Sequence, residues 1–337
     1  MEIKHHQDFS EIDQAQWDEL LSQSVTDVPF LRYSYLKLWW EFKGGGEWPQ
    51  DAKLCILTGW EGGALKGIAP FFSIKENGRE KAYFLGSIEI SDYLDVIVRP
   101  ADAEGFIRSV LEYLKSGQEN PVECLSLVNI PDKSPTNALF EKIAPETGWS
   151  VKIENAYHTP AIPLAADWDT YLAGIDKKQR HEIRRKLRRA EESAEVKWCF
   201  ADDPAILDAE IDAFFDLMIV DEDKKRFLTD PMRDQMRAII HWAFEAGYLQ
   251  LSFLTIEGVK AASYLCFDYN GHILVYNSGF DFRFSQYSPG WVLLGFLIQH
   301  AIEAGKKSFD FMRGDEDYKY RFGGVDGFVK RIDLEKA

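Results

Sequence analysis

The stretch FDFMRGDEDYKYRFGG, at residues 309–324, concentrates side chains that can do chemistry. Asp310 and Arg313 carry opposite charges and are candidate substrate-binding residues, although regular strand alternation would place them on opposite faces. Tyr318 and Lys319 put a phenol beside an ammonium group. Because such groups can donate a proton, the segment is either part of an active site or a structural turn whose aromatic residues close the end of a sheet.

A second concentration of charge lies in KKQRHEIRRKLRR, at residues 177–189. Ile183 and Leu187, four residues apart, predict a helix with a narrow apolar stripe. Arg180 and Arg184 lie one turn apart on this helix, where they either bind an anionic acceptor or donor or only keep the helix soluble. The whole chain has a formal net charge of -16, which repels nucleic acid over most of its surface, so we expect no DNA partner.

Metal, disulfide and membrane functions are not favoured by the sequence. The cysteines are scattered among apolar neighbours without CxxC spacing, which predicts reduced core thiols at Cys55, Cys124, Cys199 and Cys266. The histidines show no ligand spacing, so no metal is expected. Apolar runs fall far short of the roughly 20 residues of a membrane helix. The N-terminus also lacks a signal-peptide pattern, and we therefore expect a cytoplasmic protein without a membrane span.

The elements around these residues follow an order that occurs twice along the chain. In the first half, two helices precede three strands and then a helix, strand, helix and strand, at residues 14–24, 32–45, 53–60, 64–74, 81–87, 103–117, 122–130, 136–144 and 149–154. The second half repeats this order at residues 205–220, 232–246, 249–256, 259–269, 272–280, 289–305, 307–314, 316–322 and 327–334.

This repeat predicts an α/β protein of two tandem halves, each a mixed (α+β), mostly antiparallel sheet flanked by helices. A chain of 337 residues suits two domains of about 150 residues each. Pro160 and Pro163 interrupt regular structure between the halves. We therefore expect domains at residues 1–160 and 161–337.

The order of elements resembles the GNAT superfamily of N-acetyltransferases. In the second half, YNSGFD, SPG before an apolar helix, and FDFMRGDEDYKYRFG resemble the acetyltransferase domain of proteins similar to the cellulose-biosynthesis protein CelD. Paired GNAT-like halves also resemble the Fem-type aminoacyl transferases. The resemblance implies a GNAT-like acyltransferase that moves an acetyl or other acyl group from acyl-CoA to an amine or hydroxyl of a small-molecule, sugar or envelope-precursor acceptor.

The resemblance also places the phosphates of the donor at the N-terminus of the helix that follows Ser288. Free backbone amides and the helix dipole attract anions there. Gln286, Ser288 and Gly290, with Asn277 of YNSGFD, are the cofactor-binding residues that it implies. The usual Q/R-x-x-G-x-G/A loop is not cleanly present, because Gln286 and Gly290 are four residues apart. A helix start without a ligand therefore stays open.

Catalytic roles follow from the resemblance in the same way. GNAT enzymes commonly use a tyrosine in the last short helix to protonate the leaving thiolate, and Tyr318 is at the matching place. The phenylalanine-lysine pair of the Fem-type enzymes points to Lys319 as a group that stabilises the oxyanion, a role that contributes roughly a few kcal/mol. Asp281 is the candidate general base, with a turn aspartate as the alternative.

Two other functions remain open. In an aminoacyl-tRNA-dependent transferase of Fem type, the basic helix would contact tRNA, which is a partner only in that case. A non-catalytic GNAT-fold regulator of polysaccharide biosynthesis would have its pocket filled by side chains. Since the pair Tyr318-Lys319 has no counterpart in the first half, we assign the donor to the second half and acceptor binding or scaffolding to the first.

Overall fold

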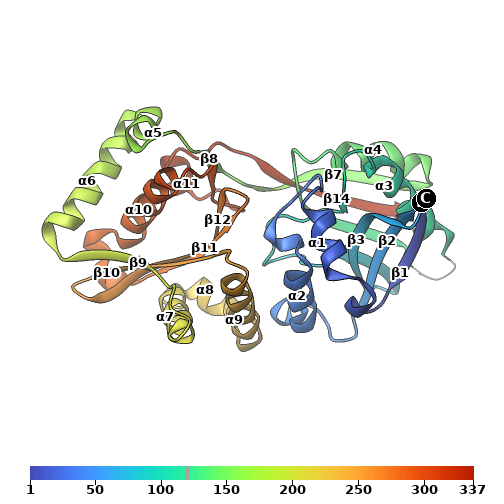
Figure 1. The fold of residues 1–337 in the computed structure, drawn as a ribbon, viewed down its shortest axis with the longest axis horizontal. Coiled ribbons are helices and arrows are strands. Elements are labelled where there is room, and N and C mark those ends of the chain that lie inside the picture. Colours follow the sequence, from blue (N-terminus) through green and yellow to red (C-terminus); the bar gives the residue numbers. More distant parts are fainter. Residues whose placement is uncertain (118–121) are drawn as a thin grey trace. The chain divides into compact units, whose positions relative to one another are not determined.

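The computed structural model describes residues 1–117 and 122–337, whose contacts form two compact units (Figure 1). Unit 1 comprises Met1–His158 and Phe328–Ala337, and unit 2 comprises Thr159–Gly327. Each unit contains one mixed sheet with helices packed on it, so the predicted fold class of two tandem α/β halves is confirmed.

Unit 1 contains the predicted helices and strands in the predicted order, with two further strands and two 3-10 helices that the sequence does not predict. Its elements are β1 (Glu2–His6), η1 (Phe9–Glu11), α1 (Gln14–Leu21), η2 (Pro29–Leu31), α2 (Tyr33–Gly46), β2 (Lys53–Glu61), β3 (Ala64–Glu76), β4 (Arg79–Phe84), β5 (Ile97–Val98), α3 (Ala103–Ser116), β6 (Cys124–Pro131), α4 (Thr136–Glu146) and β7 (Trp149–His158).

The sheet of unit 1 runs in the order β1-β2-β3-β4-β6-β14-β7, with β5 paired to β3. All of its pairs are antiparallel except β4 with β6. Strand β14 (Phe328–Lys336) comes from the end of the chain and lies between β6 and β7, as Figure 1 shows in red. The predicted second domain, 161–337, therefore differs from unit 2, which ends at Gly327.

Helices cover both faces of this sheet. A side chain at Gly67 of β3 would overlap the ring of Phe106 from α3, so α3 packs directly on the backbone of that face. Phe72, five residues further along β3, lies on the opposite face and contacts Trp39 of α2. Successive side chains of β3 thus point alternately toward α3 and toward α2. Large buried aromatic residues pack on both faces of the sheet.

Unit 2 contains the second repeat without its last strand, and the predicted basic helix α6. It also contains elements that the sequence does not predict, namely the strands β8 and β9, the helices α5 and α8, and the 3-10 helix η3. Its elements are β8 (Ala161–Pro163), α5 (Trp168–Gly174), α6 (Lys177–Ser193), β9 (Val196–Phe200), α7 (Leu207–Met218), α8 (Glu222–Phe227), α9 (Asp230–Glu245), β10 (Leu249–Ile256), β11 (Val259–Tyr269), β12 (His272–Phe280), η3 (Phe282–Tyr287), α10 (Pro289–Glu303), β13 (Ser308–Asp310) and α11 (Asp317–Arg321).

The sheet of unit 2 runs in the order β8-β13-β12-β11-β10-β9 and has one parallel pair, β12 with β13. A side chain at Gly279 of β12 would come within 2.5 Å of the backbone of Leu217, so only glycine lets α7 pack there. Phe280, on the other face, lies beside Gly290 of α10. Helices α7 and α10 therefore cover opposite faces of β12.

All four cysteines are free thiols. Three of them are buried as predicted, but Cys199 is exposed on β9. The expectation of a core thiol is wrong at this position because β9 is the edge strand of the sheet, and one of its faces is open to solvent.

Candidate active site

The strands β12 and β13 separate within unit 2 and leave a gap. They pair only from His272 to Leu274 and from Ser308 to Asp310, after which β12 continues to Phe280 alone on that side. The predicted strand 307–314 is too long, because the Asp310 carboxylate accepts the Met312 amide at 2.7 Å and Met312 adopts a φ of 53°. This turn leads the chain away from β12.

A cavity of about 310 Å³ opens at this gap. It is lined by residues of β11, β12, η3, α10 and α11, namely Tyr264, Ser278, Phe280, Ser285, Ser288, Pro289, Gly290, Trp291, Leu294 and Tyr318. Three of the predicted site residues, Ser288, Gly290 and Tyr318, therefore meet in one cavity although up to 30 residues separate them in the sequence.

The N-terminus of α10 forms one wall of the cavity. Ser288 precedes the helix in the left-handed conformation, with a φ of 54°, and its side chain makes no capping hydrogen bond. Pro289 has no N–H, and the first turn leaves the amides of Gly290 and Trp291 without acceptors inside the helix. This wall therefore presents backbone donors and the positive end of a helix dipole, which suits an anion.

Two tyrosines lie on other walls of the cavity, Tyr318 on α11 and Tyr264 on β11. The Tyr318 ring packs edge-on against Phe311, with the ring centroids 5.9 Å apart. Burial raises the pKa of the Tyr318 hydroxyl well above its ordinary value, with the Glu316 charge acting in the same direction. Burial likewise raises the pKa of Tyr264. Both phenols stay protonated at neutral pH and can act as proton donors but not as bases.

Lys319 is buried beside the cavity and does not line it. Its ammonium group donates to the carbonyl of Arg313 at 2.6 Å and to that of Gly314 at 3.3 Å, and it pairs with Glu316 at 2.9 Å. These contacts hold the loop that joins β13 to α11. The structure thus places the predicted oxyanion-stabilising ammonium inside the loop that positions Tyr318.

The structure places Asp281 at the N-cap of η3. Its carboxylate accepts the Arg283 guanidinium at 2.8 Å and the Arg283 amide at 2.9 Å, and these hydrogen bonds lower its pKa. A carboxylate with a lowered pKa is a poor general base, so the alternative of a turn aspartate fits this position. Gln286 is exposed on η3, and Asn277 accepts the Ser278 amide at 2.8 Å. These three residues lie outside the cavity lining.

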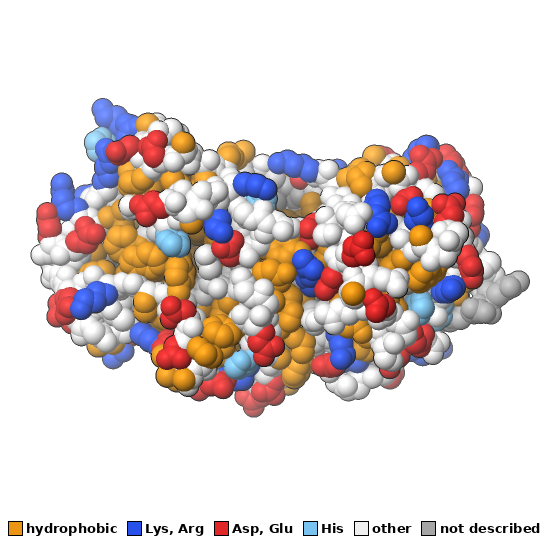
Figure 2. Space-filling view, in the orientation of Figure 1, with side chains coloured by type: hydrophobic (Ala, Val, Ile, Leu, Met, Phe, Trp, Pro, Cys, Tyr) orange, Lys and Arg blue, Asp and Glu red, His pale blue; other side chains and the backbone are white. Residues whose placement is uncertain are grey.

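The predicted substrate-binding residues do not converge on the cavity either. Arg180 donates hydrogen bonds to the carbonyls of Leu172 and Ala173, and these bonds connect α6 to the end of α5. Arg184 is exposed and pairs with Asp169 at 3.2 Å. Basic side chains appear in blue at the upper left of Figure 2, where Figure 1 shows α6. Asp310 and Arg313 instead shape the loop after β13.

Sequence reasoning missed Tyr264 and Ser278 as residues of the site. Tyr264 stands in an ordinary strand pattern, and Ser278 lies just beyond a β-bulge at Tyr276, where Leu265 pairs with Asn277 but Cys266 pairs with Val275. Bulges are frequent next to active sites because they redirect side chains. No sequence signal marks this bulge, since its position depends on the pairing of β11 with β12.

The corresponding place in unit 1 is occupied by polypeptide. Beyond the end of β4, the segment 86–96 runs along β6, where the Leu94 amide donates to the Asn129 carbonyl and the Asn129 side chain donates to the Ser91 carbonyl, both at 2.8 Å. Asp95 of this segment is fully buried and accepts hydrogen bonds from three hydroxyl groups, those of Thr26, Ser134 and Thr136. Burial raises the pKa of Asp95. These hydrogen bonds fix the segment 86–96 alongside β6 beyond the end of β4.

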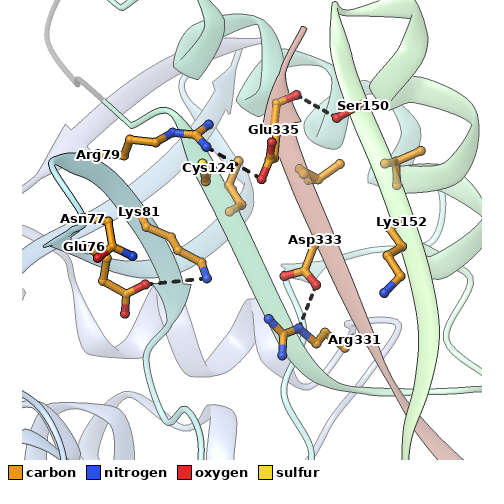
Figure 3. A pocket seen from close by; sticks show the side chains of 13 residues that line it. Glu76, Asn77, Arg79, Lys81, Cys124, Ser150, Lys152, Arg331, Asp333 and Glu335 are labelled. Atoms are coloured by element: carbon orange, nitrogen blue, oxygen red, sulfur yellow. Dashed lines mark hydrogen bonds and ion pairs between the residues drawn. The ribbon is translucent and has the colours of Figure 1, made fainter.

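Unit 1 has a different concave surface, a groove of about 680 Å³ on the open face of β4, β6, β14 and β7 (Figure 3). Its cations are paired with carboxylates: Arg79 lies 3.8 Å from Glu335, Lys81 lies 3.7 Å from Glu76, and Arg331 pairs with Asp333 at 2.8 Å. Such ion pairs on an exposed sheet face stabilise a protein little. The groove is a polar surface whose charges largely balance one another.

Among the described residues, no group of histidine, cysteine, aspartate and glutamate side chains is arranged to hold a metal ion. In the same part of the chain, no helix has both the length and the hydropathy needed to cross a membrane.

Residues 177–320 match the family model of the acetyltransferase (GNAT) domain. These residues of unit 2 therefore form a GNAT-type acetyltransferase domain, and the prediction of a GNAT-superfamily acyltransferase is confirmed. No curated protein sequence matches the chain significantly.

Solved structures share the two-unit fold over nearly the whole chain. FemX superposes with a TM-score of 0.68 at 13% identity, covering 98% of this chain and 97% of its own. L-PGS from Bacillus licheniformis gives a TM-score of 0.57 at 12% identity, with 96% and 92% covered. A tandem GNAT protein from the clavulanic acid biosynthesis pathway gives 0.51 at 12% identity, with 98% and 97% covered. At these identities the likeness establishes the fold alone.

Proposed function

We propose that unit 2 transfers an acetyl or other acyl group from acyl-CoA to an amine, or to a hydroxyl, of a small-molecule, sugar or envelope-precursor acceptor. The observation that carries this proposal is the cavity at the gap between β12 and β13, which lies between the uncapped N-terminus of α10 and Tyr318. A donor whose phosphates meet the amides of Gly290 and Trp291 extends its thioester arm into the gap. A mostly apolar lining that includes Phe280 and Leu294 suits that arm.

In this proposal the residues in and beside the cavity have different roles. The first turn of α10 binds the phosphates, as its free amides and dipole favour. Tyr318 donates its proton to the sulfur when the C–S bond breaks, and the raised pKa means that the phenol carries this proton at neutral pH. Lys319 acts through Tyr318, because it fixes the loop from Arg313 to Glu316.

A single substitution, Gly290→Glu, tests the donor site. The added Cβ would lie 3.5 Å from Phe280, an ordinary contact, so the fold tolerates it, and a carboxylate in the first turn favours the helix. The same carboxylate would face the donor phosphates. We expect the affinity for acetyl-CoA, measured by isothermal titration calorimetry, to fall at least about tenfold, because like charges in contact cost more than one kcal/mol.

The matched control is Gly105→Glu, in the first turn of α3 in unit 1, where the nearest atom to an added Cβ is a Met1 methyl carbon at 3.5 Å. This variant should bind acetyl-CoA as the unmodified protein does. Equal affinity of both variants, with unchanged melting temperatures, would contradict a donor site at α10.

We assign unit 1 to acceptor binding or to a scaffolding role. Two observations support this assignment: the segment 86–96 occupies the place of a donor, and the polar groove on β4, β6, β14 and β7 offers hydrogen-bonding groups to a polar molecule.

A second candidate function is transfer from an aminoacyl-tRNA, which the shared fold with FemX and the exposed basic side chains of α6 favour. In that case charged tRNA should bind more weakly as salt rises from about 50 to 200 mM, and Arg184→Gln should lower the slope of log affinity against log salt by about one. Filter binding measures both. A tRNA affinity that is negligible at low salt, as the net charge of -16 favours, removes this candidate.

A further inference from the structure

Lys224 is a partly buried lysine at the edge of the proposed site that the mechanism above does not use. It lies on the short helix α8, whose first turn is capped by the Asp221 carboxylate, an acceptor of the Lys224 amide at 3.1 Å. Its side chain crosses to β12, where the amine contacts the Ser278 carbonyl and lies 3.3 Å from the Ser278 hydroxyl. Ser278 itself lines the cavity.

The surroundings of this amine differ from those of its neighbours on α8. Lys225 and Arg226 are exposed and pair with Glu222 and Asp223. Among the residues that the structure describes, the Lys224 amine has its hydrogen-bonding contacts with the neutral carbonyl and hydroxyl groups of Ser278.

Two carboxylates act on Lys224 from further away, Asp221 on its own helix and Glu316 in the loop before α11. Glu316 is itself paired with Lys319. Burial lowers the pKa of Lys224, and it outweighs both carboxylates, which act in the opposite direction. A lysine of this kind has a neutral fraction at a pH where exposed lysines are charged, and it can accept a proton.

Lys224 lies at the gap, where a neutral amine could accept a proton from an acceptor molecule. Ser278 belongs to β12 on one side of the gap, and Glu316 belongs to the loop after β13 on the other. The donor enters at α10, which covers the face of β12 opposite to α7. An acceptor that reaches the thioester past Ser278 therefore meets Lys224, whose amine lies at the Ser278 carbonyl and hydroxyl.

We propose that the Lys224 amine is the general base that removes a proton from the acceptor amine. This inference rests on the proposed donor site in the same unit. The acceptor ammonium gives one proton to the Lys224 nitrogen. The acceptor nitrogen, now neutral, attacks the thioester carbonyl to form the C–N bond. The C–S bond breaks, and the thiolate takes the Tyr318 proton. The second proton of the attacking nitrogen returns to the Tyr318 oxygen through solvent, and Lys224 releases its proton to water.

The test compares Lys224→Met and Lys224→Arg with the control Lys225→Met. The measurement is release of the coenzyme A thiol from acetyl-CoA with propylamine or glucosamine as probe acceptors, between about pH 6.5 and 10. Both Lys224 variants should lose about 10²-fold in rate near neutral pH, since a general base contributes that much. Arginine keeps the charge and the hydrogen bonds but stays protonated, so it cannot restore the rate.

The pH profile separates a base from a structural residue. The deficit of Lys224→Met should shrink as the pH approaches about 10, where propylamine loses its own proton, because an alkylamine titrates near the pKa of lysine. Lys225→Met should match the unmodified enzyme, and all variants should bind acetyl-CoA equally. Full activity in Lys224→Arg, or a Lys224→Met profile parallel to the unmodified one, would overturn the inference alone. No thiol release by the unmodified enzyme with either probe counts against the proposed function and against this inference with it.

Discussion

Replacing Tyr318 with phenylalanine is expected to lower the rate of acyl transfer by about 10²-fold or more, the usual contribution of a general acid. The ring would still pack against Phe311, so the cavity and the affinity for acetyl-CoA should be unchanged. Only the proton for the leaving thiolate would be missing. The rate of thiol release from acetyl-CoA in the presence of a primary amine, compared with calorimetric donor affinity, checks both parts of this expectation.

Tyr320 provides the matched control on the same helix. Its hydroxyl lies 3.1 Å from Asp326 and is not part of the cavity lining, so Tyr320→Phe should keep the full rate. If Tyr318→Phe were equally active, the proton for the thiolate would come from elsewhere, with Tyr264 as the next phenol in the cavity.

Lys319→Met is expected to lower both stability and activity. Methionine fills the space of the buried stem, but the partly buried carbonyls of Arg313 and Gly314 would lose their donor, at a cost of roughly 1 kcal/mol for each hydrogen bond. The loop before α11 would then loosen, and with it the position of Tyr318. Thermal unfolding and the rate of thiol release measure the two effects.

This expectation separates a positioning lysine from an oxyanion-stabilising one. The control is Arg321→Met, which removes an exposed pair with Asp317 on the same helix and should change stability by less than about 1 kcal/mol. If Lys319→Met kept its melting temperature while the rate fell, the ammonium would act directly on the reaction, as the resemblance to the Fem-type enzymes implied.

The strands and helices of both halves could be predicted because each carries its own local pattern. The alternation in LQLSFLTI and HILVYNSGF defines β10 and β12 to the residue. The sequence does not predict β8 and α8, and it makes the predicted strand at β13 too long, because segments of three to six residues carry little periodicity. The pairing of β14 in unit 1 could not be predicted either, because alternation says which face of a strand is buried but not which sheet it joins.

Residues of the candidate site could be predicted only where the residue type and the helix or strand that carries it are enough to assign the role. Ser288 and Gly290 start a helix and Tyr318 follows a strand, and the resemblance to GNAT enzymes implied that these places belong to one site, where the structure has one cavity. Asp281 and Lys319 are of residue types that could act as a base and as an oxyanion-stabilising group. In the fold, however, Asp281 pairs with Arg283 and Lys319 pairs with Glu316. Lys224 shows the reverse case, because nothing in EDKKRF distinguishes it from Lys225 until the fold brings it to Ser278.

The most direct test of the account is the stoichiometry of acetyl-CoA binding to the whole chain by isothermal titration calorimetry. Unit 2 has a cavity at its strand gap, and unit 1 has the corresponding place filled by residues 86–96. We therefore expect one donor molecule to bind per chain. Two molecules per chain, or no binding at all, would contradict it.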